Sequence, residues 1–390
     1  MSRQFIPKPS QQVQVFHGPE ALRQAGDAWQ ALEESGACPT PFQAWRWVSA
    51  WQKNFSHGEP VLLLARDDDG MPLALLPLQL ERHMGFARLT WLSVPGLQYG
   101  GLLLHPCAQT GREEIFLALW EELLRQRADY IDLPLLPAND AFAAFLARHC
   151  HAGADNASFR IDFSGHEDWR AYELSLKSSA RRARKKRLNK LKRAGELTFT
   201  VHAPGPDMAP VLARALEWKR GWLKAQGLEG ALPFTDAFAR LLDDLFARRG
   251  EKSASTRWLV AVLALDGEPI AVDAGKVCGD AFYSWFSAYD ADHAEHSPGK
   301  IALWLMMQWC MEQGLKAYDM LANPTSYKEE WANQRVELAH FLKPLSVAGR
   351  AWVLWATHGA PLAREMYHSL PPGMKAAVRR PLMYLRNAGK

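Results

Sequence analysis

Two stretches of the sequence share one strand–turn–strand pattern, and this repeat limits the possible fold more than any other feature. Residues 61–80 read VLLLARDDDGMPLALLPLQL, and residues 258–277 read WLVAVLALDGEPIAVDAGKV. In each stretch an Asp-Gly pair separates two apolar runs and Pro-x-Ala follows, at a constant offset of 197 residues. Asp-Gly between apolar runs is typical of a β-hairpin, because the turn needs positive φ. The repeat therefore predicts a duplicated unit.

The segments after each hairpin also correspond between the two halves. The expected elements are strands near 89–93 and 101–104, a helix over 112–127 and a strand at 130–133, then a strand at 281–287, a helix over 300–313 and a strand at 317–320. Gly314 is placed to end the second helix. Asp132 and Asp319 occupy matching strands. This order predicts an α/β fold of two tandem subdomains with mixed central sheets.

The chain of 390 residues is long enough for two or three domains. We expect an N-terminal subdomain over 13–160, a C-terminal subdomain over 165–345 with a helical insert at 167–250, and a helical tail over 346–390. The expected helices of the insert run from about 167 to 195, with Leu174, Leu188 and Leu191 as an apolar stripe, from 210 to 226 and from 235 to 249. The tail reads as two amphipathic helices that Pro371-Pro372 separates.

Positive charge is concentrated in one segment of the insert. The ten basic residues of this segment are Lys177, Arg181, Arg182, Arg184, Lys185, Lys186, Arg187, Lys190, Lys192 and Arg193, with no acidic residue among them. The rest of the chain has 36 basic and 42 acidic side chains. Such a basic block is typical of contact with a polyanion or an anionic surface, although it also fits a solvated helix.

Several classes of protein do not fit this sequence. The N-terminus lacks the apolar run of a signal peptide, and no stretch of ~18 apolar residues predicts a transmembrane helix. The five cysteines are widely spaced and no pair has CxxC spacing, which favours reduced thiols in a cytosol over a zinc site. His293 and His296 have HxxH spacing but lack an evident third ligand, so we expect no metal.

The turn His296-Ser-Pro-Gly-Lys300 leads into an apolar helix that should be buried. Free N–H groups and the positive end of the helix dipole make a helix start suitable for phosphate, and Gly299 lets a ligand approach the backbone. Ser297, Pro298, Gly299 and Lys300 are therefore candidates for binding the pyrophosphate of a donor. The alternative is a helix cap only, with Ser297 capping and Pro298 at the first helical position.

The order of these motifs resembles a known family. Asp-Gly-x-Pro-x-Ala, an aromatic strand, Ser297-Pro-Gly299, a helix, Gly314, Asp319 and Tyr327-Lys328-x-x-Trp331 follow one another as in the GNAT-type acyltransferases of the CelD/BcsL group. These are named for bacterial cellulose and exopolysaccharide loci, and they are related to the FemABX aminoacyltransferases, which carry two GNAT-like subdomains and a helical arm. The resemblance is strongest over residues 165–345, where Ser178-Ser-Ala-Arg-Arg182 is similar to the family's basic helix opening.

The resemblance implies direct transfer of an acyl group from acyl-CoA, with acetyl-CoA the first choice, to an amine or hydroxyl. The acceptor would be a sugar, a polysaccharide precursor or another cell-envelope compound, possibly nucleotide- or lipid-linked. It implies no covalent enzyme intermediate and no metal. The first half has no Ser-Pro-Gly, only Gln109-Thr-Gly111, so we expect it to have lost donor binding and to shape the acceptor side.

Four residues are candidates for the chemistry. Asp273 interrupts an apolar strand, which suggests either a general base or a solvent-facing position. Asp319 is a second candidate base, or a brace at a strand end like Asp132. Lys328 could stabilise an anionic carbonyl or phosphate, or simply be exposed beside two glutamates. Tyr327 could protonate a leaving thiolate, or only pack.

The basic helix leaves competing functions open. Arg181, Arg182, Lys185 and Lys186 could bind an anionic acceptor or the inner face of a membrane. RNA binding would suit a FemABX-like aminoacyl-tRNA-dependent enzyme, but the basic block contains no aromatic residue for base stacking. A non-catalytic polyanion-binding scaffold is the third reading. If the chain is an enzyme, Asp273, Asp319 and Lys328 should line one groove beside Ser297–Gly299. We expect a cytoplasmic monomer, possibly peripheral at the membrane.

Overall fold

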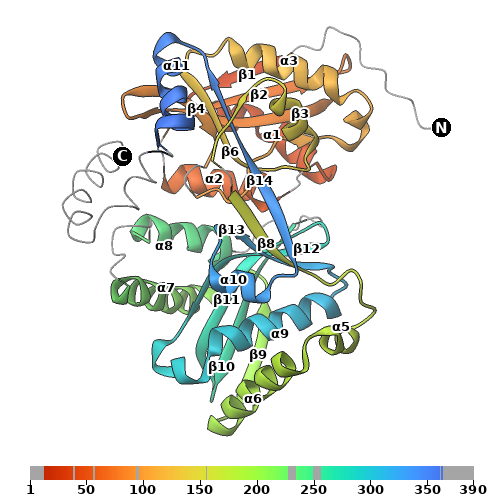
Figure 1. Ribbon diagram of the computed structural model, residues 1–390, viewed down its shortest axis with the longest axis vertical. Coiled ribbons are helices and arrows are strands. Elements are labelled where there is room, and N and C mark those ends of the chain that lie inside the picture. Colours follow the sequence, from red (N-terminus) through yellow and green to blue (C-terminus); the bar gives the residue numbers. More distant parts are fainter. Residues whose placement is uncertain are drawn as a thin grey trace. The chain divides into compact units, whose positions relative to one another are not determined.

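The computed structural model describes residues 13–37, 40–55, 58–93, 96–154, 156–226, 234–248, 256–360 and 362. It divides into two units, one made of residues 1–48, 56–157 and 336–390, the other of residues 49–55 and 158–335. Each unit is a mixed sheet with helices packed on it (Figure 1). The chain is therefore α/β, with two mixed-sheet units, as the repeat predicts.

The first unit is built on the first hairpin. Its strands are β1 (Val13–His17), β2 (Glu59–Arg66), β3 (Pro72–His83), β4 (Phe86–Trp91), β5 (Leu103–Leu104), β6 (Tyr130–Pro137), β7 (His151–Ala152) and β14 (Gln334–Pro344). Its helices are α1 (Ala21–Glu34), α3 (Arg112–Leu124), α4 (Ala141–Ala147) and α11 (Val347–Leu354), while α2 (Trp45–Asn54) runs from this unit into the second. The sheet has the order β1-β2-β3-β4-β6-β14, and only the β4/β6 pairing is parallel.

The second unit repeats this arrangement. Its strands are β8 (Asn156–Asp162), β9 (Leu197–His202), β10 (Thr256–Leu265), β11 (Glu268–Cys278), β12 (Ala281–Tyr289) and β13 (Ala317–Ala322). Its helices are α5 (Trp169–Ser175), α6 (Ser178–Ala194), α7 (Met208–Ala225), α8 (Asp236–Leu242), α9 (Pro298–Glu312) and α10 (Ser326–Trp331). The order is β8-β13-β12-β11-β10-β9, and only the β12/β13 pairing is parallel.

The hairpins predicted from sequence are the β2–β3 and β10–β11 pairs, and their turn glycines have positive φ, +84° at Gly70 and +83° at Gly267. Each sheet is completed by a strand from the other half of the sequence. Strand β14 pairs with β6 in the first unit, and β8 pairs with β13 in the second. The periodicity of the sequence could not reveal this exchange, because strand pairing across long separations leaves no local signal.

The basic segment differs from the single helix that the sequence predicts. It forms α5 and α6, and the chain between them is extended at Leu176 (ψ 151°) and Lys177 (ψ 136°). The Ser175 hydroxyl donates to the carbonyl of Tyr172 at 2.7 Å, a local bond that competes with continued helix. The predicted apolar stripe is also wrong at Leu174, which is 60% exposed on α5, whereas Leu191 is fully buried.

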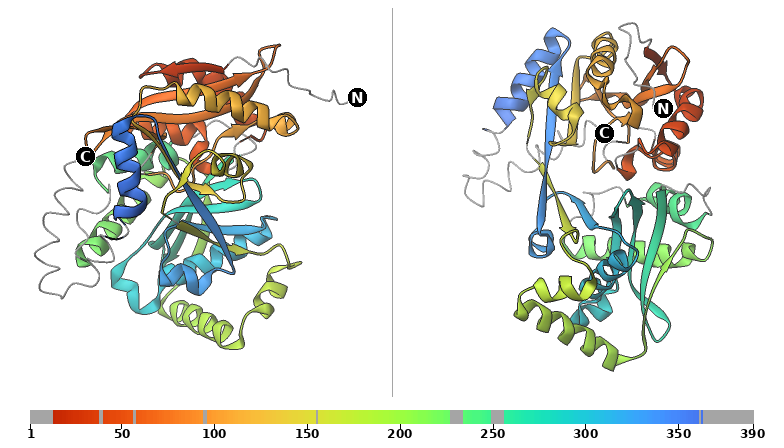
Figure 2. Two further views of the ribbon diagram at one scale, coloured as in Figure 1. Left: turned by 45° about the horizontal axis from the view of Figure 1, so that its top comes forward. Right: turned by 90° about the vertical axis from the view of Figure 1, so that its right-hand side faces the viewer.

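Helix α6 lies alongside α9 on one face of the second sheet (Figures 1 and 2). Leu191 of α6 is buried in one cluster with Leu263, Ala271 and Ile301, and Leu188 packs against that cluster. Two other predicted helices also depart from expectation. The helix after residue 235 is α8 followed by a π-helical turn at 243–247, and the tail begins with α11 and a similar turn at 355–359. The second predicted tail helix, with Pro371-Pro372, lies outside the described residues.

Candidate functional site

Three adjacent strands of the second sheet bring two hydroxyl groups to one buried carboxyl group. Asp273 of β11 is 3% exposed. The Ser284 hydroxyl on β12 donates to its Oδ1 and the Tyr318 hydroxyl on β13 donates to its Oδ2, both at 2.6 Å. Burial raises the pKa of Asp273 to about 6, although the two hydrogen bonds oppose this rise. The group can therefore take up and release a proton near neutral pH.

The sequence positions Asp273 through strand alternation and one glycine. Ala271, two residues earlier, packs against α9, so Asp273 points to the same face. A β-bulge lies between Ala274 and Gly275, and a Cβ at Gly275 would overlap the carbonyl of Tyr283. The close approach of β12 at this glycine sets Ser284 beside Asp273. The reading of Asp273 as a solvent-facing strand residue is therefore wrong.

Strands β12 and β13 pair only over a short length. Their parallel register covers Ala281–Tyr283 and Ala317–Asp319, whereas β12 continues to Tyr289 and β13 continues to Ala322. Past this point the two strands are not hydrogen-bonded to each other. The end of the pairing lies next to Tyr318, so the Asp273 cluster lies where the sheet stops being continuous.

Two lysines donate to backbone carbonyl groups beyond that point. Lys328 of α10 donates from Nζ to the carbonyls of Leu321, at 3.1 Å, and Ala322. Lys219 of α7 donates to the carbonyl of Ser287 at 3.2 Å. Burial lowers the pKa of Lys328 to about 8, the charge of Asp319 opposes this, and the charge of Lys219 adds to it. Burial also lowers the pKa of Lys219. Lys328 is therefore not the exposed lysine of the alternative reading.

Asp319 lies on the other side of the sheet from the Asp273 cluster, because it follows Tyr318 directly in β13. It is 2% exposed, and its Oδ1 accepts from the N–H of Leu321 at 2.7 Å. Leu321 has a φ of 65°, a strained value for leucine, so this bond braces the end of the strand. The four predicted residues consequently do not line one groove. Tyr327 lies near the Asp273 cluster, and Lys328 lies near Asp319.

The matching residue of the first unit has a structural role. Asp132 accepts from Arg88 Nη1 at 3.0 Å and bonds His340 Nε2 at 2.7 Å. Burial would raise its pKa, but the hydrogen bond to His340 and the charge and hydrogen bond of Arg88 outweigh burial and lower it. The other ring nitrogen of His340 accepts from the N–H of Ala154, so neither nitrogen is available for proton transfer.

Tyr327 stands on α10 and is 39% exposed. Burial and the charge of Asp273 raise its pKa, so the phenol stays protonated at neutral pH and can donate a proton. Sequence reasoning missed Ser284, Tyr318 and Lys219. Two signals could have identified the first two: Ser284 is a polar residue within an aromatic strand, and Tyr318 is a tyrosine next to Asp319. Lys219 could be found only from the packing of α7 on β12.

Ser297, in the turn before α9, does not cap the helix with its side chain. Ser297 has left-handed torsions (φ 55°, ψ 52°) and its hydroxyl does not cap the helix. Its carbonyl instead accepts from the N–H groups of Lys300 and Ile301, and Pro298 begins the helix as expected. A Cβ on Gly299 would lie 3.2 Å from the ring of Tyr289. Tyr289 belongs to the part of β12 that does not pair with β13. Gly314 follows α9 with a φ of +75°, as predicted.

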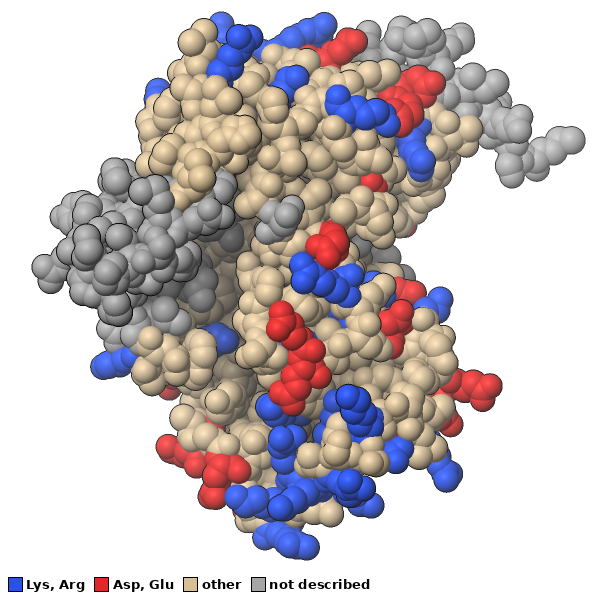
Figure 3. All heavy atoms as spheres, in the orientation of Figure 1, with Lys and Arg blue, Asp and Glu red and all other residues tan. Residues whose placement is uncertain are grey.

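The predicted anion-binding residues of α6 do not act alike. Arg181 donates to the carbonyl of Leu174 at 2.9 Å and so holds the end of α5. Arg182, Lys185 and Lys186 are exposed, and Figure 3 shows lysine and arginine side chains gathered over this end of the second unit. These three are available to an anionic partner.

His293 and His296 lie in a 3₁₀ turn at Ala291–His296, not in an open loop. Within the described ranges no three His, Cys, Asp or Glu side chains are grouped to hold a metal ion. Cys107, Cys150, Cys278 and Cys310 carry thiols that are not joined in disulfides. No helix in the described part of the chain is both long enough and apolar enough to cross a membrane.

Comparison with known proteins agrees with the fold. Residues 178–329 match the family model described as an acetyltransferase (GNAT) domain. No curated protein matches the chain. Similar solved structures include the C-terminal domain of a putative lysylphosphatidylglycerol synthetase from Agrobacterium fabrum, with 12% identity over 86% of this chain and 98% of that one at a TM-score of 0.53.

FemX is similar as well, with 11% identity over 80% of this chain and 95% of its own at a TM-score of 0.53. L-PGS from Bacillus licheniformis has 14% identity over 85% and 95% at a TM-score of 0.50. Identities this low show a shared fold only. The match over residues 178–329 supports an acyltransferase with a GNAT domain in this part of the chain.

Proposed function

We propose that the chain transfers an acyl group, acetyl first among the candidates, from acyl-CoA directly to an amine or hydroxyl of a sugar, polysaccharide precursor or other cell-envelope acceptor. The observation that carries the proposal is the carboxyl group of Asp273, buried between two hydroxyl donors with a pKa of about 6. A general base with a pKa near the working pH suits removal of a proton from such an acceptor.

Proton transfer would pass through Ser284. Asp273 is almost fully buried, whereas Ser284 is partly exposed and donates to it. As the acceptor attacks the thioester carbonyl, its proton moves to the Ser284 oxygen while the Ser284 proton moves to Asp273. This relay leaves Ser284 neutral and stores one proton on the carboxyl group, so no covalent bond to the enzyme forms.

The remaining charges are assigned to α10. Lys328 acts as a positioning residue, because its ammonium group donates to the carbonyls of Leu321 and Ala322 and so holds α10 against the end of β13. The phenol of Tyr327 protonates the thiolate that leaves. We keep Asp319 as a positioning residue, since its carboxylate braces the strand from which α10 follows.

We assign donor binding to the Ser297–Lys300 turn, in the C-terminal subdomain of residues 165–345, and acceptor recognition to the N-terminal subdomain of residues 13–160. The resemblance to the CelD/BcsL group supports an exopolysaccharide or envelope acceptor. A cytoplasmic monomer with peripheral contact at the inner membrane face would suit the exposed cations Arg182, Lys185 and Lys186.

The experiment is a transfer assay that follows thiol release from acetyl-CoA and longer acyl-CoAs, with a panel of amino and hydroxyl sugars, free and nucleotide-linked. Turnover with an acyl-CoA supports the proposal. Turnover with an aminoacyl-tRNA in place of every acyl-CoA would overturn the donor, and saturable polyanion binding without any turnover would favour a scaffold.

A further inference from the structure

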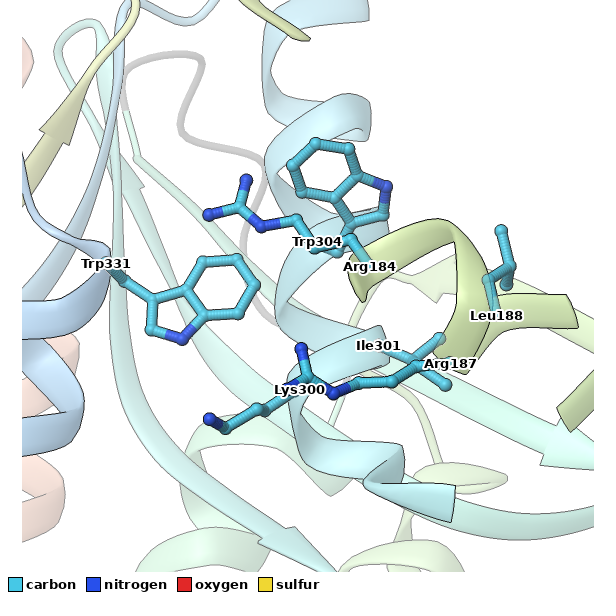
Figure 4. Close-up of a pocket in the computed structure, with 7 residues that line it drawn as sticks. All are labelled: Arg184, Arg187, Leu188, Lys300, Ile301, Trp304 and Trp331. Carbon is cyan, nitrogen blue, oxygen red and sulfur yellow. The ribbon is translucent and has the colours of Figure 1, made fainter. Parts of the chain in front are cut away.

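A pocket on the second unit brings together several cationic groups, of which only Lys300 has a role in the proposed chemistry. It is lined by Arg184, Arg187 and Leu188 of α6, by Lys300, Ile301 and Trp304 of α9, and by Trp331 of α10 (Figure 4). Its volume is about 230 Å³ with its open mouth included. This volume includes open solvent, so a ligand would bind in the mouth of the pocket rather than inside an enclosed cavity.

Arg184 is fixed in this pocket by two aromatic rings. Its guanidinium carbon lies 4.4 Å from the ring centroid of Trp304 and 4.1 Å from that of Trp331. Burial lowers the pKa of Arg184, while Tyr172 and Glu330 oppose the shift. An arginine remains charged under such a shift, because its ordinary pKa is above 12. A positive charge is therefore held in a fixed orientation between α9 and α10.

Two N–H donors at this pocket lack an acceptor in the described protein. Arg184 Nη1 and Trp331 Nε1 are buried and have no hydrogen-bond partner. Buried donors are normally paired, because leaving one unpaired destabilises the folded protein, so two in one place point to an acceptor that is not part of the chain.

The charges around the two donors favour an anion as that acceptor. Arg187 makes no hydrogen bond or ion pair with any described residue, and Lys300 contacts the exposed carboxylate of Glu330 at 3.0 Å. Three cationic side chains thus face one acidic one. Lys300 also lies in the first turn of α9, a helix of 15 residues whose positive dipole end adds to the field.

We propose that this pocket is a binding site for a phosphoryl group. A phosphoryl group offers several acceptor oxygens in different directions, which matches donors that come from three helices, α6, α9 and α10. The group could belong to the nucleotide portion of coenzyme A or to the diphosphate of a nucleotide-linked acceptor. Which of these two molecules supplies the phosphoryl group rests on the proposed function, whereas the presence of the site does not.

The site would also couple ligand binding to the catalytic groups. Trp331 and Glu330 belong to the same six-residue helix as Tyr327 and Lys328. A phosphoryl group that contacts Arg184, Arg187 and Trp331 would tie α10 to α6 and so fix Tyr327 and Lys328. Loss of the site should therefore affect substrate affinity first and turnover second.

The test compares two charge reversals on one helix by isothermal titration of the full chain with coenzyme A, UDP and inorganic pyrophosphate. Arg187→Glu removes a pocket cation, while Lys192→Glu changes the net charge equally at an exposed position outside the pocket. We expect Arg187→Glu to weaken at least one ligand about 10-fold or more and Lys192→Glu to change it less than about 2-fold. Trp331→Phe keeps an aromatic ring but removes the N–H, and it should weaken the same ligand several-fold.

Each outcome decides between the claims. Equal weakening by the two charge reversals, or no binding of any of the three ligands to the wild type, would overturn the phosphoryl site. If the wild type binds coenzyme A and Arg187→Glu binds it equally well, the phosphoryl site is overturned but the proposed function stands. Binding of UDP or pyrophosphate but not coenzyme A, lost in Arg187→Glu, keeps the site and counts against acyl-CoA as donor.

Discussion

Replacing Asp273 by Asn should abolish most of the activity without destabilising the protein. Asn keeps the size of the side chain and one oxygen, but it cannot accept a proton. One of the two hydroxyl groups, from Ser284 or Tyr318, can reverse and accept from the new amide. Loss of a general base typically lowers the rate by about 10²- to 10⁴-fold, so we expect kcat to fall within that range.

The same substitution should stabilise the folded protein at neutral pH, because the pKa of Asp273 differs between the folded and unfolded states. Burial raises the pKa of Asp273 from 3.8 to about 6. Below pH 3.8 the carboxyl is protonated in both folded and unfolded chains. Between pH 3.8 and 6 the folded state retains a proton that the unfolded state has lost, so the contribution of this group to stability falls as pH rises. Above pH 6 the loss is constant, about 3 kcal/mol at 1.36 kcal/mol per pKa unit.

Asn has no such loss, because it stays neutral. The unfolding free energy of Asp273→Asn, relative to wild type, should therefore be higher at pH 7.5 than at pH 4.5 by about 2 kcal/mol, because part of the wild-type loss has already occurred at pH 4.5. Urea unfolding at the two pH values and thiol release from acyl-CoA measure the two effects. A variant that loses activity and stability together at pH 7.5, or that keeps full activity, would refute the assignment of Asp273 as the base.

Three further predictions concern other buried charges. Lys328→Met removes the hydrogen bonds that hold α10 to Leu321 and Ala322, so it should lower kcat about 10- to 100-fold. It should also remove a fall in rate that we expect above pH 8, where the lysine loses its proton, as a pH–rate profile would show. Lys219→Met removes the neighbouring positive charge that lowers the pKa of Lys328, so the alkaline limb of the profile should move to higher pH; an unmoved limb would contradict the coupling. Asp132→Asn leaves Arg88 and His340 without their buried carboxylate and should lower the unfolding free energy by about 3 kcal/mol in urea, whereas a neutral effect would contradict its structural role.

The parts of the fold that sequence could predict are those with local causes. The Asp-Gly turns, Gly314 at the end of α9 and Pro298 at its start each depend on a backbone requirement of one or two residues. The order of strands and helices within each half followed from periodicity. These signals sufficed for a duplicated α/β fold.

The remaining features depend on contacts between distant segments. The exchange of β8 and β14 between the sheets, and Lys219 reaching the carbonyl of Ser287, join residues far apart in sequence. Asp273 was identified as unusual because a carboxylate rarely interrupts an apolar strand. Its hydroxyl partners could not be identified, since they depend on the register of β11, β12 and β13 and on the bulge at Gly275.

The most direct test of acyl-CoA as donor is a thermal-shift titration of the wild type and Gly299→Leu with acetyl-CoA, longer acyl-CoAs and free CoA. A ligand that binds the folded state at 100 times its Kd stabilises it by about 2.7 kcal/mol, a shift of several degrees. In Gly299→Leu the new side chain begins with a Cβ 3.2 Å from Tyr289 and should block the donor. We predict a saturating rise in Tm with one CoA thioester that the variant loses. No shift with any CoA compound, or an equal shift in both proteins, would contradict the account.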